Sequence, residues 1–200
     1  GRPPFRADHI GSLLRPQKLR QAFRRHTAGE ITEPAFRAAQ DEAIRDVVKL
    51  QEDCGLEVVN DGEFRRISYW EKFVRLTAGL TVKEAVFKFH DDHGHEADFT
   101  APYAEGRVSR AGPITVDEFE FVKGLTSAVP KITMPAPSTM HLYRFSDYAA
   151  PGLYRDPEEF FVELGRIYQQ EIADLAAAGA QYVQLAEVAL AMMCDPAARA

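Results

Sequence analysis

The sequence predicts an α/β protein with a parallel β-sheet, because twice an apolar stripe at helical spacing ends at a glycine and leads into a strand-like run. In the first unit, Thr32-Glu33-Pro34 is typical of a helix start, since proline at the first helical position loses no hydrogen bond. Gly55 ends this helix, and a strand is expected over residues 56–60. In the second unit Gly179 ends the helix, and a strand is expected over residues 181–185.

The other segments are assigned from the same signals. Residues 5–10 are expected to form a strand that Gly11-Ser12 breaks, and residues 18–25 a short helix with a basic, solvated face. Residues 131–134 predict one more strand, followed by prolines. No internal repeat, low-complexity tract or linker is visible, so residues 1–200 are expected to form a single domain.

The composition is that of an ordinary globular protein: 200 residues, 46% hydrophobic, with a net charge of −6. The acidic balance argues against nucleic acid as a partner, and no apolar run reaches the ~18–20 residues that a membrane span needs. No signal-peptide pattern opens the chain, and Cys54 and Cys194 do not make a disulfide framework, so a reducing, cytoplasmic setting is expected. Cys54 falls on the apolar stripe of its helix, which predicts a buried structural thiol rather than a nucleophile.

Polar residues follow each predicted strand at its carboxyl end, where loops of parallel α/β proteins carry their chemistry. They are Gly11 and Ser12, then Asn60, Asp61 and Glu63, then Ser138 and His141, and finally Ala186 and Glu187. Each has a purely structural alternative, because Gly11-Ser12 could be a turn with a capping serine and Asp61-Gly62 a turn that leaves Glu63 in solvent. Four polar strand ends in one chain favour a shared site.

The pattern weakens between residues 80 and 113, and the stretch HDDHGHE at residues 90–96 is expected to be an exposed loop or hairpin. His90, His93 and His95 lie there among three acidic residues, which together could supply ligands to a metal ion. Their spacing matches neither an i, i+4 helical pair nor a cysteine-containing zinc module, so a solvated loop is the favoured interpretation.

Taken together, these segments resemble the cobalamin-independent methionine synthases, and more closely the shorter proteins related to the catalytic C-terminal barrel of that enzyme. The resemblance rests on an ordered set of motifs: His9-Ile10-Gly11-Ser12, the run from Asn60 to Arg66, Gly112-Pro113-Ile114-Thr115, the run from Lys131 to Ser138, and the run from Tyr182 to Glu187. Each motif alone is weak, but the ordered set spans nearly the whole chain.

The resemblance implies a (β/α)8 TIM barrel of the methionine synthase and uroporphyrinogen decarboxylase type, of which this chain holds the N-terminal half, since its four strands are too widely spaced for eight. It implies a cytoplasmic methyltransferase that moves a methyl group from a methyltetrahydrofolate to homocysteine sulfur, with zinc holding the thiolate. By the same resemblance, Ile10, Gly11 and Ser12 would receive the amino-acid carboxylate and Glu63 its ammonium. Ser138, His141 and Glu187 would line the pocket, with His141 near a folate-stacking position.

Two departures from the family pattern concern the substrate. Ala186 stands where an aspartate would help to bind the ammonium, and loss of one such charged partner costs about 1.5–3 kcal/mol, roughly ten- to a hundredfold in affinity. Leu13-Leu14-Arg15-Pro16 also differs from the methionine synthase pattern, which weakens the case for homocysteine itself.

The zinc ligands of the family, a His-x-Cys pair, a glutamate and a distant cysteine, match nothing in these 200 residues and are expected beyond residue 200. Two alternatives therefore stay open beside methionine synthesis. One is a related barrel enzyme that alkylates another thiol or decarboxylates an acidic substrate. The other is a non-catalytic binding module.

Overall fold

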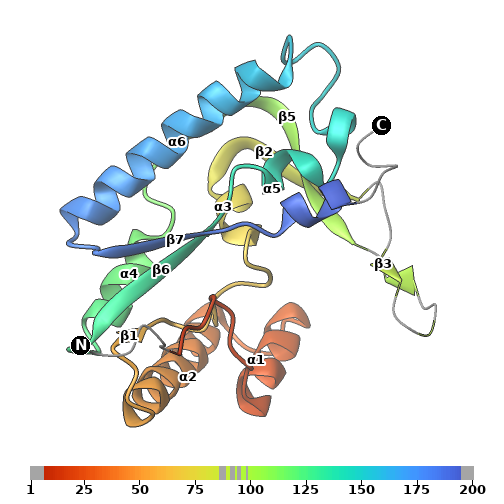
Figure 1. Cartoon of the computed structure of the whole chain (residues 1–200). Helices are drawn as coiled ribbons and strands as arrows, with labels where there is room; N and C mark the ends of the chain where they lie inside the picture. Colours follow the sequence, from red (N-terminus) through yellow and green to blue (C-terminus); the bar gives the residue numbers. More distant parts are fainter. Residues whose placement is uncertain (1–6, 86–88, 91–92, 94–95, 98, 195–200) are drawn as a thin grey trace.

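The computed structural model describes residues 7–85, 89–90, 93, 96–97 and 99–194. Its centre is a parallel sheet in the order β1-β6-β7, formed by β1 (Val58–Val59), β6 (Val129–Pro135) and β7 (Tyr182–Ala186) (Figure 1). The strands expected over 56–60, 131–134 and 181–185 are thus confirmed, the first in shortened form. Within the described ranges β1 and β7 each pair with one neighbour, so the sheet is open at both edges.

A helix precedes each of these strands, as the α/β interpretation requires: α2 (Glu33–Asp53), α4 (Val116–Lys123) and α6 (Pro157–Ala177). The start of α2 is confirmed, because the Thr32 hydroxyl accepts a hydrogen bond from the Ala35 amide and Pro34 occupies the first turn. Asp156 caps α6 in the same way by accepting from the Glu159 amide at 2.9 Å.

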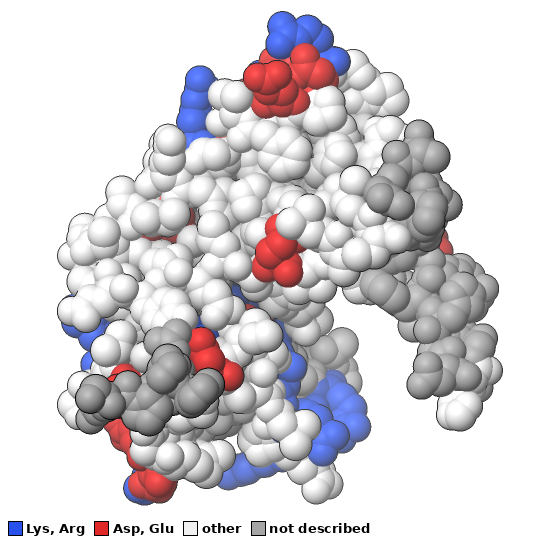
Figure 2. Space-filling view, in the orientation of Figure 1, with Lys and Arg blue, Asp and Glu red and all other residues white. Residues whose placement is uncertain are grey.

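Helix α1 (Gln17–Thr27) is the predicted basic helix, and it packs on α2. Leu19 and Ala22 face the core, whereas Lys18, Arg20 and the Arg24-Arg25 pair are exposed. Figure 2 shows lysine and arginine side chains gathered over the lower right of the molecule, where α1 lies in Figure 1.

Two groups of buried side chains hold these layers together. The larger lies between α6, β6 and the segment after β1, and includes Phe73, Met134, Phe160 and Leu164. The smaller joins α1 and α2 to β1 and α4, and includes Ile44 at 0% exposed.

An antiparallel hairpin of β2 (Thr77–Glu84) and β5 (Thr100–Arg110) follows the short helix α3 (Glu71–Arg75) and was not expected from the sequence. The sequence gives little indication of these two strands, because they are only partly buried and a bulge at Gly79 interrupts the alternation of apolar and polar residues. Beyond it, β3 (Phe89–His90) pairs with β4 (Glu96–Ala97), which confirms a hairpin at the histidine-rich stretch. Three short helices complete the described chain: α5 (Thr139–Leu142), η1 (Phe145–Asp147) and η2 (Ala189–Cys194).

Two expectations are corrected. Residues 7–10 are extended but pair with no described strand, and the rest of the strand expected at 5–10 lies outside the described residues. Cys54 is exposed, not buried, because it caps the end of α2 beyond Gln51, the last buried side chain of that helix.

No helix in the described part of the chain has the length and apolarity to cross a membrane.

Candidate active site

The segment from His9 to Gly11 lies against the parallel sheet and is held by its carbonyl oxygens, through side chains of β6 and β7 and of the residue after β1. Asn60, after β1, donates to the Gly11 carbonyl at 3.1 Å, and Gln184 of β7 donates to the Ile10 carbonyl at 2.6 Å. Lys131 of β6 donates to the His9 carbonyl and to Gln184 Oε1. The sheet therefore holds this segment by hydrogen bonds that the carbonyl oxygens of residues 9–11 accept.

In the part of the chain that the structure describes, the amides of residues 10–12 have no hydrogen-bond acceptor. Among the described residues, the N–H groups of Ile10, Gly11 and Ser12 donate to no carbonyl and to no side chain. The Ile10 side chain is 75% exposed and Ser12 is exposed, so these residues offer a ligand their backbone amides and the Ser12 hydroxyl. Consecutive free amides suit an anion such as a carboxylate.

Glu63 is buried directly beside Gly11. A Cβ on Gly11 would stand 2.6 Å from Glu63 Oε1, so only glycine leaves room for this carboxylate. Oε1 accepts a hydrogen bond from the Thr133 hydroxyl at 2.7 Å and lies 3.5 Å from Arg66 Nη1. The interpretation of Asp61-Gly62 as a turn that leaves Glu63 in solvent is therefore wrong, since Glu63 is 3% exposed.

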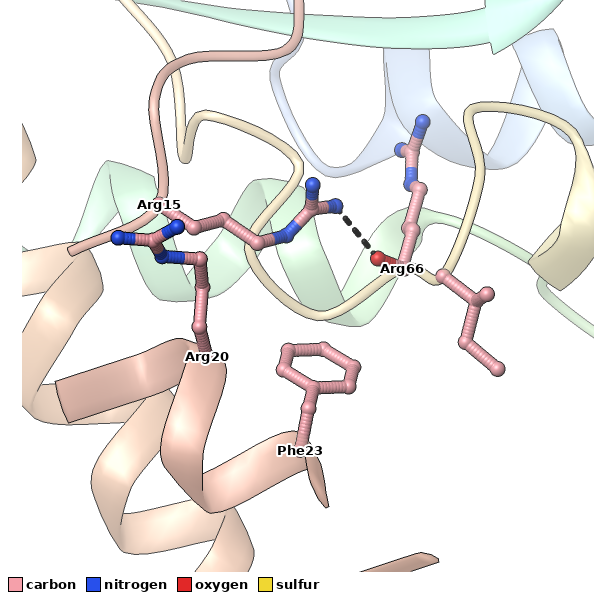
Figure 3. Close-up of a pocket in the computed structure, with 5 residues that line it drawn as sticks. Arg15, Arg20, Phe23 and Arg66 are labelled. Carbon is pink, nitrogen blue, oxygen red and sulfur yellow. Dashed lines mark hydrogen bonds between the residues drawn. The ribbon is translucent and has the colours of Figure 1, made fainter. Parts of the chain in front are cut away.

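The loop after β1 presents Glu63 through an unusual backbone. Glu63 has φ of +59°, in the left-handed region that a non-glycine residue occupies only when its surroundings hold it there. Asp61 Oδ1 accepts from the Glu63 amide at 2.8 Å, and Arg15 donates to the carbonyls of Glu63 and Arg66 at 3.1 and 2.6 Å. Arg15 reaches them from a hollow of about 200 Å³ next to α1, where Figure 3 shows it beside Arg20.

Charged groups beneath this loop form a buried network. Arg66 pairs with Glu118 at 2.6 Å and donates to the Thr133 carbonyl at 2.8 Å. Burial alone would raise the pKa of Glu118, but the charges of Arg66 and Lys72 outweigh it and lower that pKa. Burial, reinforced by the charge of Glu118, raises the pKa of Asp61 to about 6.

The other predicted residues gather at the ends of β6 and β7. The Ser138 hydroxyl donates to Glu187 Oε2, and Glu187 Oε1 accepts from the Leu190 amide at 2.9 Å. Ala186 ends β7 opposite Pro135, with its carbonyl accepting from Ala136. The ring of His141 lies 4.7 Å from Tyr148 and 5.6 Å from Phe161, and burial lowers its pKa, which favours a neutral imidazole.

Two residues of the site were not predicted from the sequence. Tyr69 lies between the two groups: its hydroxyl contacts Tyr143 at 3.0 Å, and both Glu187 and Glu63 add to the effect of burial in raising its pKa. No strand end or motif marks it. Lys131 could have been found, since a lysine inside a short apolar strand is unusual and its side chain is 0% exposed.

The described residues do not fit a zinc site. No group of three or more His, Cys, Asp or Glu in the described ranges could hold a metal ion. Of the histidine-rich stretch, His93 is exposed, while the side chains of His90 and His95 lie outside what the structure describes. The metal interpretation of that stretch stays untested.

This chain is similar to known proteins over nearly its whole length. Residues 5–194 match the family model described as the cobalamin-independent synthase, catalytic domain. The chain is 30% identical over 200 residues to the uncharacterized protein YxjH of Bacillus subtilis, covering 98% of this chain and 51% of that protein. It is 32% identical over 193 residues to the 5-methyltetrahydropteroyltriglutamate–homocysteine methyltransferase of Thermosynechococcus vestitus, covering 94% of this chain and 24% of the enzyme.

Two solved structures of B12-independent methionine synthases, one of them described as putative, are similar to this chain. A putative vitamin-B12-independent methionine synthase from Listeria monocytogenes matches with a TM-score of 0.76 and 27% identity, over 96% of this chain and 54% of that one. A B12-independent methionine synthase from Shewanella sp. W3-18-1, in complex with selenomethionine, matches with a TM-score of 0.65 and 25% identity, over 80% and 45% of the two chains. The chain thus spans about half the length, or less, of the relatives it matches.

Proposed function

The chain belongs to the family of cobalamin-independent synthase catalytic domains, and we propose that it supplies the amino-acid pocket of a methyltransferase that acts on homocysteine sulfur. Residues 1–200 would be a single folding unit and the N-terminal half of a (β/α)8 barrel. The open edges of β1 and β7 and the half-length coverage of the relatives support this.

One observation carries the proposal: the buried Glu63 carboxylate lies against Gly11, next to three amides that have no partner among the described residues. An amino acid presents a carboxylate and an ammonium on one carbon, so it needs a donor cluster and an anion side by side. The amides of residues 10–12 would bind the carboxylate, and Glu63 would bind the ammonium. Holding both groups orients the side-chain sulfur toward a methyl donor, and such positioning lowers the barrier to transfer.

In the proposed reaction the sulfur forms a bond to the methyl carbon while the bond from that carbon to a nitrogen of the folate-type donor breaks. The thiol loses its proton so that the thiolate attacks, and the donor nitrogen takes up a proton as it leaves, so the products are the methyl thioether and the demethylated donor. The described residues do not fit a zinc site. Ser138, His141 and Glu187 would line the space beyond Glu63, toward the donor.

Isothermal titration of methionine and homocysteine into the full-length protein tests the proposal, with Ala186→Asp as the informative variant. An aspartate at the end of β7 would restore a second partner for the ammonium, so affinity should rise roughly ten- to a hundredfold. Ala173→Asp, which adds the same charge at an exposed position of α6, should leave the affinity unchanged. If neither the natural protein nor the Ala186→Asp variant binds either amino acid, the proposal fails.

A further inference from the structure

Arg65 is buried on the opposite side of the loop from the amino-acid pocket. Whereas Arg66 reaches Thr133 and Glu118, Arg65 reaches Asp41 of α2 at 2.6 Å and stacks on Phe121 of α4 at 4.5 Å. Its side chain is only 4% exposed. Within the described part of the chain its Nε and Nη1 atoms are buried and have no hydrogen-bond partner.

The Arg65 side chain is one of the residues that line a hollow of about 310 Å³ between α1, α2 and α3. Gln40, itself 3% exposed, also lines the hollow, and its amide makes no hydrogen bond to any other residue that the structure describes. Buried polar groups in folded proteins nearly always have partners. A hollow lined by Arg65, whose Nε and Nη1 atoms have no partner among the described residues, is therefore a candidate ligand site.

The other charges around the hollow are largely paired. His26 contacts Glu33 at 2.9 Å, Arg75 contacts Glu71 at 2.8 Å, and Arg37 lies 3.7 Å from Asp117. The carboxylates of Glu33 and Glu71, which also line the hollow, are thus paired with other side chains, and no acceptor among the described residues reaches Nε or Nη1 of Arg65. A guanidinium binds a carboxylate with particular strength, because its N–H groups and the two oxygens match in geometry.

The remaining wall is aromatic. Phe36 stacks under His26 at 4.4 Å, and Phe23 meets Phe36 edge-on at 4.8 Å. We propose that this hollow binds a small organic carboxylate, with its oxygens on Arg65 and Gln40 and its apolar body against Phe36. The site is separate from the amino-acid pocket, and the proposal does not rest on the function proposed above.

Arginine Nε–H resonances in a ¹H–¹⁵N spectrum test this directly, because Arg65→Lys identifies the Arg65 signal by its loss. Titration with benzoate should shift that signal saturably, and acetate should bind more weakly because it lacks an apolar body. The Arg66 signal should stay in place, since its guanidinium is already bound by Glu118 and Thr133. Inorganic phosphate is the third probe.

Arg37→Gln, at the rim of the hollow, should weaken benzoate binding about threefold or more, because it removes a nearby positive charge. Lys49→Gln removes the same charge from an exposed position about three turns further along α2 and should leave binding unchanged. The proposal is overturned if no probe shifts the Arg65 signal, which would leave water as the occupant. It is also overturned if phosphate alone binds, or if all arginine signals move together.

Discussion

The Glu63 carboxylate occupies the space that a side chain on Gly11 would need, 2.6 Å from the position of its Cβ. Gly11→Ala should therefore displace Glu63 from Thr133 and destabilise the fold by about 1–3 kcal/mol, the usual cost of overpacking. Denaturant unfolding measures the loss, and titration should show weaker amino-acid binding. Unchanged stability and unchanged binding would mean that Glu63 does not depend on this glycine.

Glu63→Gln should weaken methionine binding roughly ten- to a hundredfold, because the amide carries no charge for the ammonium. The analogue 4-(methylthio)butanoate, which lacks the amino group, should bind the variant and the natural protein equally. Titration of both ligands shows whether Glu63 contacts the ammonium or only shapes the pocket. An equal loss for both ligands would show that Glu63 shapes the pocket without contacting the ammonium.

Asp61 should make stability depend on pH between about 4 and 6. Burial raises its pKa to about 6 in the folded protein, from 3.8 as the ordinary value, so the folded state binds more protons than the unfolded state in that window. Stability from this group is present below pH 4 and is lost as pH rises to 6, by about 3 kcal/mol at most.

Asp61→Asn should remove this dependence, since an amide does not titrate and its oxygen can still accept from the Glu63 amide. The measurement is the free energy of unfolding of natural protein minus variant across that pH range. Asp46→Asn, at an exposed position of α2, is the control and should give a flat difference. A flat difference for Asp61→Asn as well would contradict the assignment.

Arg66→Met should destabilise the protein by about 3–5 kcal/mol, because Glu118 would be left as a buried charge with less compensation. Replacing both residues, Arg66→Met with Glu118→Met, should recover part of that loss in urea unfolding. Lys49→Met breaks an exposed pair with Asp53 and should change stability very little. A double variant less stable than the single one would contradict this account.

Gly79→Ala should open the β2–β5 hairpin. Gly79 has φ of +84°, and a Cβ there would lie 2.5 Å from the Arg107 carbonyl oxygen. Gly29→Ala is the matched control, because Gly29 also has positive φ, at +72°, with nothing within 4 Å of its Cβ position. The control should lose about 1–2 kcal/mol from the left-handed backbone, and Gly79→Ala about 1–3 kcal/mol more. Hydrogen exchange of the hairpin amides measures the difference.

The parallel strands and the helices before them could be predicted because their signals are local. Thr32 and Pro34 define the start of α2, and Gly55 ends it, whatever the rest of the chain does. The β2–β5 hairpin could not, because partial burial and the bulge at Gly79 leave no clear alternation. Cys54 was misplaced for a related reason: spacing shows which face a residue shares, but not where the core ends.

The candidate site likewise has a part that could be predicted from the sequence and a part that depends on the tertiary structure. The residue types after each strand, together with the order of the motifs, were enough to indicate the family and to propose Gly11, Glu63, Ser138 and Glu187 as candidates for the site. Only the tertiary structure decided that Glu63 is buried against Gly11, that the amides of residues 10–12 are free, and that Arg65 and Arg66 face opposite ways. These are contacts between segments about 50 or more residues apart, and a distance between such segments depends on the packing of the whole sheet rather than on local preference.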